Sequence, residues 1–164
     1  MKVFVTVGSM LPFERLIKAM DEWARQNPDV EVVAQTGGGA YVPTAMKHQA
    51  MVAPDAYRRH CAEADVIVSH VGMGTVITAA EVGKPLVALP RRRDLQEVTS
   101  DHQIATAKWL REKPGVEVVD NEAQLGAAIE HMLGGPAVED FGAASREKLV
   151  TCVKAFLDDA VTRR

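Results

Sequence analysis

Residues 70–75, His-Val-Gly-Met-Gly-Thr, have the composition of a turn that binds an anion. The turn lies between an apolar run and a segment of small residues that continues to Val82. A helix that starts there would present unpaired backbone N–H groups and the positive end of its dipole, which bind phosphate without a cationic side chain. Gly72 and Gly74 would admit a phosphate close to the backbone, or they would only permit a tight turn and close packing.

A second turn of this kind, Gly8-Ser9, follows the N-terminal apolar run at 2–7. Pro12 suits the first turn of a helix that begins near it. Both turns are expected to offer backbone N–H groups at the start of a helix, so either one could hold an anion.

A polar cluster follows the apolar run at 85–90. The planar guanidinium groups of Arg91, Arg92 and Arg93 suit oxyanions such as pyrophosphate or a sugar carboxylate, although a solvated loop would have the same composition. Around the next helix start come Asp94, Glu97, Asp101, His102 and Gln103. Asp101 and Gln103 would face a ligand, or they would only cap the helix and expose an amide.

Three other kinds of site fit the sequence poorly. The G-x-G-x-x-G spacing is missing after Gly74, and the second apolar run ends in Gln35 rather than in an acid that would bind a ribose, which disfavours NAD. No G-x-x-x-x-G-K-[ST] run indicates a P-loop. Ser69, His70 and Asp101 could be imagined as a triad, but no G-x-S-x-G turn supports a hydrolase.

Short apolar runs alternate with helical patterns along the chain, which predicts a parallel sheet. Valine-rich runs bounded by Gly, Pro or Asp are typical of strands buried on both faces. Five such strands are expected, at 2–7, 30–35, 65–70, 85–90 and 116–120, and residues 47–54 would form a sixth short strand or a loop.

Helical patterns fill the spaces between these runs. They are expected over 12–26, from Asp55, from Thr99 or Ser100, over 121–133 behind an Asn121 cap, and over 143–162 with a long apolar stripe. The predicted fold is α/β, a single Rossmann-like doubly wound parallel sheet in one domain, 1–164. In such sheets ligands bind at the carboxyl ends of the strands, where the strand order reverses.

Length and composition limit the function classes. A chain of 164 residues with 47% hydrophobic content fits one domain with a full core. The net charge of -3 argues against general binding of nucleic acid. Cys61 and Cys152 have no zinc-site or disulfide-framework spacing, which fits a reducing, cytoplasmic setting. No 18-residue apolar run occurs, so membrane association would need a surface or a partner.

Three segments together resemble a known family. VFVTVGS with PFERLI, ADVIVSHVGMGTVITAAEVGKPLVALP at 64–90 and SDHQ at 100–103 are similar to the C-terminal, donor-binding half of glycosyltransferase family 28, the MurG-like enzymes of GT-B fold. The likeness is closest to the split form of the family, in which a short cytoplasmic chain carries the nucleotide-sugar site and a membrane-associated chain supplies the acceptor half. The dolichol-linked UDP-GlcNAc transferase and bacterial PssE-like exopolysaccharide enzymes are of this form.

The resemblance implies an inverting, metal-independent transfer from a UDP-sugar, which is a substrate and not a cofactor. In the family the second glycine turn faces the diphosphate, the polar helix start faces the donor sugar, and the first glycine turn faces the interdomain cleft. Gln103 is expected to bind sugar hydroxyls. The expected donor-binding residues are Gly8, Ser9, His70, Gly72, Met73, Gly74, Thr75, Thr78, Arg91, Arg92, Arg93, Asp101, His102 and Gln103.

Two features depart from the family pattern. Thr78 stands where the family usually has a ribose-binding glutamate, and Glu81, about one helical turn later, would be a displaced replacement or a surface acid. The chain has one Rossmann-like domain where GT-B enzymes need two, and the family's general base lies in the other domain. The helix at 143–162 would dock the missing half, or it would pack on its own sheet.

The sequence therefore predicts the donor-binding subunit of a two-chain glycosyltransferase acting on a lipid-linked exopolysaccharide precursor. Its membrane-associated, acceptor-binding partner would recruit it from the cytoplasm to the inner face of the membrane. The alternatives are a small UDP-sugar epimerase-like enzyme and a non-catalytic partner that stabilises or regulates a transferase. Three arginines beside the sugar end make UDP-glucuronate a hypothesis for the donor.

Overall fold

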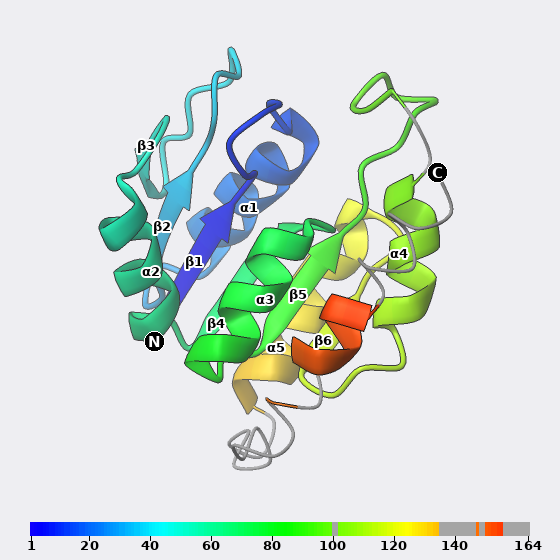
Figure 1. Cartoon of the computed structure of the whole chain (residues 1–164). Helices are drawn as coiled ribbons and strands as arrows, with labels where there is room; N and C mark the ends of the chain where they lie inside the picture. The colour runs from blue at the N-terminus through cyan, green and yellow to red at the C-terminus, as the bar shows by residue number, and fades with distance from the viewer. Residues whose placement is uncertain (100–101, 135–146, 148–149, 156–164) are drawn as a thin grey trace.

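The computed structural model describes residues 1–99, 102–134, 147 and 150–155. Its centre is one six-stranded parallel sheet in the order β3-β2-β1-β4-β5-β6 (Figure 1). The strands are β1 (Lys2–Thr6), β2 (Glu31–Gln35), β3 (Lys47–Gln49), β4 (Val66–His70), β5 (Leu86–Leu89) and β6 (Val116–Val118). The predicted α/β doubly wound sheet is confirmed. Residues 47–54, which the sequence left open between a strand and a loop, form a strand at Lys47–Gln49 alone.

Helices cover both faces of the sheet (Figure 1). They are α1 (Glu14–Gln26), α2 (Pro54–Glu63), α3 (Met73–Val82), α4 (His102–Leu110) and α5 (Leu125–Gly134), with a short 3-10 turn at Glu122–Gln124. Helices α1 and α5 share one hydrophobic core with alternate residues of the strands, and α2, α3 and α4 share the other. In β1, for example, Val3 and Val5 belong to the first core and Phe4 to the second, because successive side chains point to opposite faces.

The predicted helices that fall within the described residues are present, but some of them begin at other residues. α1 starts at Glu14, since Phe13 is not helical and the Pro12 carbonyl accepts a hydrogen bond from a distant arginine. α2 starts at Pro54, because a proline fits the first position of a helix. α4 starts at His102, and Ser100 lies outside the described residues. Asn121 caps the 3-10 turn that leads into α5, with its Oδ1 accepting from the N–H of Ala123, and α5 itself begins at Leu125.

The strand order reverses at β1, which pairs with β2 on one side and β4 on the other. After β1 the chain passes to α1 on one face, and after β4 it passes to α3 on the opposite face. The two loops diverge and leave a crevice at the carboxyl ends of these strands, where sheets of this type bind their ligands.

The predicted C-terminal helix at 143–162 is described only at residue 147 and over 150–155, which are helical. Val153 is fully buried in the core that α2, α3 and α4 share, and Val150 packs against it. This part of the apolar stripe packs on its own domain. The remainder lies outside the described residues, so a docking role for the helix stays a prediction. No helix in the described ranges is long and apolar enough to cross a membrane.

Candidate functional site

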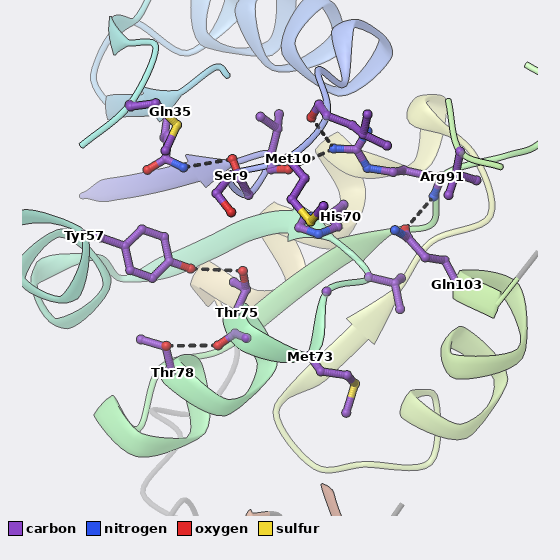
Figure 2. Close-up of a pocket in the computed structure, with 18 of the residues that line it drawn as sticks. Ser9, Met10, Gln35, Tyr57, His70, Met73, Thr75, Thr78, Arg91 and Gln103 are labelled. Carbon is purple, nitrogen blue, oxygen red and sulfur yellow. Dashed lines mark hydrogen bonds between the residues drawn. The ribbon is translucent and has the colours of Figure 1, made fainter. Parts of the chain in front are cut away.

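A cavity of about 760 Å³ occupies the crevice at the switch point (Figure 2). Its walls come from the loops that follow β1, β3, β4 and β5, from the end of β2 and from the first turns of α2, α3 and α4. Ten of the fourteen expected donor-binding residues line it: Gly8, Ser9, His70, Gly72, Met73, Gly74, Thr75, Thr78, Arg91 and Gln103. The two glycine turns, far apart in the sequence, are brought together here.

The imidazole of His70, at the end of β4, explains two of these glycines. A Cβ at Gly8 would lie 2.7 Å from Cε1 of His70, and a Cβ at Gly72 would overlap Nε2. Gly8 also has a φ of 78°, which side-chain-bearing residues rarely adopt. Both positions therefore require glycine so that the ring can fit between the two turns, before any ligand is considered.

His70 is neutral at physiological pH. Burial of the ring and the positive charge of Arg91 lower its pKa to about 4, and the backbone of Thr6 opposes this shift less strongly. A neutral imidazole brings hydrogen-bonding atoms to the cavity wall without a charge.

Helix α3 begins beside the cavity with unpaired backbone donors. Gly72 is its extended N-cap, and no side chain caps the helix. The N–H groups of Met73 and Gly74 make no hydrogen bond within the described part of the chain. A Cβ at Gly74 would meet nothing within 4 Å, so a ligand can approach the backbone at this residue. The start of α3 can therefore hold an anion.

Two threonines line the α3 side of the cavity. The hydroxyl of Thr75 lies 3.0 Å from that of Tyr57 in α2, and burial raises the pKa of the tyrosine (Figure 2). Thr78 donates its hydroxyl to the Gly74 carbonyl at 3.0 Å. Because this bond uses the hydroxyl proton, the lone pairs of Thr78 are left to accept from a ligand hydroxyl.

Arg91 lies under the β1–α1 loop and is only 2% exposed. Its guanidinium carbon is 4.8 Å from the centre of the Phe13 ring. Its two terminal nitrogens donate to four backbone carbonyls, those of Val7, Leu11, Pro12 and Glu97. The sequence suggested that this guanidinium binds an oxyanion directly, whereas its terminal N–H groups bind the protein's own backbone.

Two buried glutamines hold the same loops. Gln35, at the end of β2, donates from Nε2 to the Gly8 carbonyl at 3.0 Å. Gln103, in the first turn of α4, accepts from the N–H of Arg91 at 3.1 Å through Oε1 (Figure 2). Gln103 does line the cavity, as expected, and one side of its amide is used to hold the β5–α4 loop.

Two of the other four expected residues, Arg92 and Arg93, lie outside the cavity lining. Arg92 forms an ion pair with Asp94 and does not line the cavity. Arg93 is exposed and borders a neighbouring groove between the β1–α1 and β5–α4 loops. His102 is the first residue of α4, and Asp101 lies outside the described residues.

The structure also places Glu81, the possible replacement for a ribose-binding glutamate, and Ser69, the serine of the imagined triad. Glu81 pairs with Arg58 of α2 at 3.1 Å and does not line the cavity, so it is placed as a surface acid. Ser69 is fully buried and donates its hydroxyl to the carbonyl of His70 at 2.7 Å. A serine in this position is inaccessible to a substrate, which agrees with the absence of a hydrolase motif.

One wall of the cavity was missed by the sequence analysis. It is made by the segment before α2, by α2 itself and by the tip of the β1–α1 loop: Met10, Leu11, Met51, Val52, Pro54 and Tyr57. A signal was available, because α2 follows β3 and must begin at the carboxyl edge of a parallel sheet. The sequence left residues 47–54 open between a short strand and a loop, so the start of α2 could not be placed at that edge.

The described lining of the cavity carries positive charge without a carboxylate. Arg91 is the ionised side chain in it, and no Asp or Glu occurs among the described residues that line the cavity. Elsewhere in the described ranges no group of three or more His, Cys, Asp or Glu is placed to hold a metal ion.

The family model for the glycosyltransferase family 28 C-terminal domain matches residues 2–138, which include both glycine turns and every described residue of the cavity lining. The chain belongs to glycosyltransferase family 28. The resemblance inferred from the two turns and the SDHQ segment is thereby confirmed.

Among characterised proteins, the mouse UDP-N-acetylglucosamine transferase subunit ALG13 is similar to this family 28 chain. The two are 28% identical, and the alignment covers 68% of this chain and 10% of the mouse protein. The chain therefore corresponds to a small part of that protein.

Solved glycosyltransferases have the same fold as this family 28 domain. The kitacinnamycin glycotransferase superposes with a TM-score of 0.70 at 21% identity, covering 96% of this chain and 42% of that one. The calicheamicin glycosyltransferase CalG4 has a TM-score of 0.67 at 18% identity, covering 99% and 42%. A UDP-glucose:anthocyanidin 3-O-glucosyltransferase in complex with UDP has a TM-score of 0.62 at 15% identity, covering 94% and 36%. The chain spans less than half the length of each.

Proposed function

We propose that this chain is the donor-binding subunit of a two-chain inverting glycosyltransferase that takes its sugar from a UDP-sugar. The observation that carries the proposal is the charge pattern of the cavity. The free N–H groups of Met73 and Gly74 and the buried cation of Arg91 lie at one cavity, and no carboxylate occurs among its described lining residues. Such a site favours a dianionic diphosphate and repels a cation.

The same pattern suits the chemistry of glycosyl transfer. As the sugar leaves, negative charge builds up on the departing diphosphate, and fixed donors and positive charge stabilise that charge. The proposed pose places the diphosphate at the start of α3, near Ser9, whose hydroxyl makes no hydrogen bond among the described residues. No resident cofactor is needed for this role.

The apolar wall of the cavity is the proposed place for the base of the nucleotide. Met51, Val52 and Pro54 line it, beside the ring of Tyr57. Apolar and aromatic side chains with a few polar groups are typical of small-molecule sites and suit a flat heterocycle. On this orientation Thr78 lies beside the ribose.

A general base for the acceptor hydroxyl is proposed to come from a second chain. His70 is the titratable imidazole of the described lining, and its pKa of about 4 makes it a weak base. The mouse relative is named as a subunit of its transferase, which supports a two-chain enzyme. We propose a membrane-associated partner that binds a lipid-linked exopolysaccharide precursor and recruits this chain from the cytoplasm to the inner membrane face.

A donor sugar that carries a carboxylate, such as glucuronate, would need a cationic partner in the protein. Of the three arginines that suggested UDP-glucuronate, Arg91 binds backbone carbonyls and Arg92 binds Asp94. Arg93 makes no ion pair among the described residues and is the candidate for a uronate. Calorimetry of the chain with its partner should then show weaker UDP-glucuronate binding in Arg93→Ala and unchanged UDP-glucose binding. Equal binding of UDP-glucuronate, UDP-glucose and UDP-GlcNAc, unaffected by Arg93→Ala, removes the hypothesis.

Binding of UDP tests the core of the proposal. The full chain is titrated calorimetrically with UDP, uridine and ADP, alone and with the partner. UDP is expected to bind at least about tenfold more tightly than uridine, since the diphosphate adds charge-assisted hydrogen bonds. A chain that binds no UDP under either condition, or that binds ADP equally well, contradicts a UDP-sugar site.

A further inference from the structure

We propose that Arg91 is a positioning residue for the donor: it shapes the β1–α1 loop above the cavity and supplies positive charge to a bound diphosphate without donating a hydrogen bond to it. The inference rests on the proposed function for the identity of the ligand. It goes beyond that function because it assigns the role to a side chain whose terminal donors are all used inside the protein.

The contacts of Arg91 join the β5–α4 loop to the β1–α1 loop at the carboxyl edge. One terminal nitrogen donates to Val7 at 2.9 Å and to Leu11 at 2.7 Å, and the other donates to Pro12 at 2.6 Å and to Glu97 at 3.3 Å. Three of these carbonyls belong to residues 7–12, the loop that carries Gly8 and Ser9 over the cavity. The planar fork of an arginine can reach four acceptors in this way, whereas the compact ammonium group of a lysine cannot.

The loop needs this support because its other ties are few. Gln35 holds the Gly8 carbonyl, and the Thr6 hydroxyl accepts from the Gly8 N–H at 3.1 Å. Ser9 makes no hydrogen bond among the described residues, and Met10 is 90% exposed. Without Arg91, the carbonyls of Val7, Leu11 and Pro12 would lose these donors, and the loop would be held at the Gly8 side alone.

The charge of Arg91 is the second part of its role. All four of its acceptors are neutral carbonyls, and the Glu97 carboxylate is taken up by Arg15 in a two-point ion pair at 2.7 and 2.8 Å. Burial lowers the pKa of Arg91, and the charge of Glu97 partly offsets this effect. A buried cation at the wall of a cavity without carboxylates strengthens its field toward a bound anion, because little water screens it there.

Ligands with and without a diphosphate separate this role from a merely structural one. The full chain and its variants Arg91→Met and Arg91→Lys are titrated with UDP, uridine and inorganic pyrophosphate. Arg111→Met is the matched control, since Arg111 also donates to a backbone carbonyl, that of Val118, and lies outside the cavity. Circular dichroism and thermal melting establish that each variant is folded, and hydrogen exchange reports the mobility of residues 8–12.

Arg91→Met is expected to weaken binding of UDP and of pyrophosphate about tenfold or more and to change uridine binding less than about threefold. Arg91→Lys should shift the UDP-to-uridine affinity ratio in the same direction by a smaller factor and speed hydrogen exchange in 8–12. Arg111→Met should leave the ratio unchanged. If Arg91→Met does not fold, Arg91→Lys carries the test.

The outcomes distinguish this inference from the proposed function. An unchanged UDP-to-uridine ratio in the folded Arg91 variants overturns the inference and leaves a UDP site intact. Wild-type binding of pyrophosphate that depends on Arg91, without binding of UDP, supports the inference and contradicts the proposed function. Wild-type chain that binds neither anion contradicts both.

Discussion

His70 fills the space that a side chain at Gly72 would need, so the two residues determine each other. The ring lies between the β1–α1 loop and the start of α3, and a Cβ at Gly72 would overlap its Nε2 atom. Gly74, two residues later, has nothing within 4 Å of the Cβ position. One glycine of the turn therefore accommodates the protein, and the other leaves the backbone open to a ligand.

Alanine substitutions at the two glycines should have opposite effects. Gly72→Ala must displace His70 and is expected to destabilise the fold by about 1–3 kcal/mol, as overpacking does. Gly74→Ala lies in open space in a helix and should keep or raise stability by up to about 1 kcal/mol, yet weaken UDP binding because the methyl group covers the backbone N–H. Urea unfolding and calorimetry measure the two quantities. Equal stability losses in both variants would show that the assignment of the glycines is wrong.

The low pKa of His70 predicts a pH dependence of stability. The unfolded chain takes up a proton near the ordinary histidine value of 6.5, whereas the folded ring stays neutral down to about pH 4. The contribution of neutral His70 is thus fully present above pH 6.5 and is lost as the pH falls toward 4, at a cost of up to about 3 kcal/mol. Because acids also titrate there, the measurement is the difference between wild type and His70→Asn. If the unfolding free energies of wild type and His70→Asn change by the same amount between pH 6.5 and 4, the ring is not buried in its neutral form.

Thr78 gives a prediction about the ribose. Thr78→Glu places a carboxylate at a position that lines the cavity, where it can accept from ribose hydroxyls. The preference for UDP over 2′-deoxy-UDP should rise by about fivefold or more. Glu81→Gln is the control, because Glu81 pairs with Arg58 outside the cavity and should not affect this preference. If Glu81→Gln reduces the preference and Thr78→Glu does not raise it, the ribose lies elsewhere.

Asp21 is a position away from the cavity where we expect a substitution to destabilise the fold strongly. This fully buried carboxylate accepts from the N–H groups of Thr44 and Ala45 and from the hydroxyl of Tyr41. Burial alone would raise its pKa, but these hydrogen bonds lower it overall. Asp21→Asn is expected to cost about 2–4 kcal/mol in urea unfolding, and the exposed neighbour Glu22→Gln less than about 0.5. Similar losses in the two variants would contradict this ranking.

The central strands were predictable because β1, β4 and β5 are buried on both faces and therefore read as largely apolar runs, whereas the exposed β3 does not. The two glycine turns could be paired from the sequence for a similar reason: parallel strands end at one edge. Helix starts were less predictable, since Pro12 precedes α1 and its carbonyl is held by Arg91 from 79 residues away.

The role of Arg91 could not be predicted from the sequence. A run of three arginines looks the same in a sequence whether its side chains bind a ligand, a carboxylate or a backbone carbonyl. Their surroundings assign one to the β1–α1 loop, one to Asp94 and one to the surface. The partners of Arg91 are backbone carbonyls, three of them in residues with no polar side chain, so no residue pattern indicates them. The apolar wall near Met51 was missed for a related reason, because it depends on a three-residue strand.

The most direct test of a donor-binding half-enzyme is the rate of UDP release from a UDP-sugar in the presence of a lipid-linked acceptor. The rate is measured for this chain alone, for the proposed membrane-associated partner alone, and for the two co-expressed. Because the described cavity lining offers no good general base, neither chain alone should release UDP above background, and the pair should do so in step with glycosylation of the acceptor. Release by this chain alone at the rate of the pair would contradict the two-chain account.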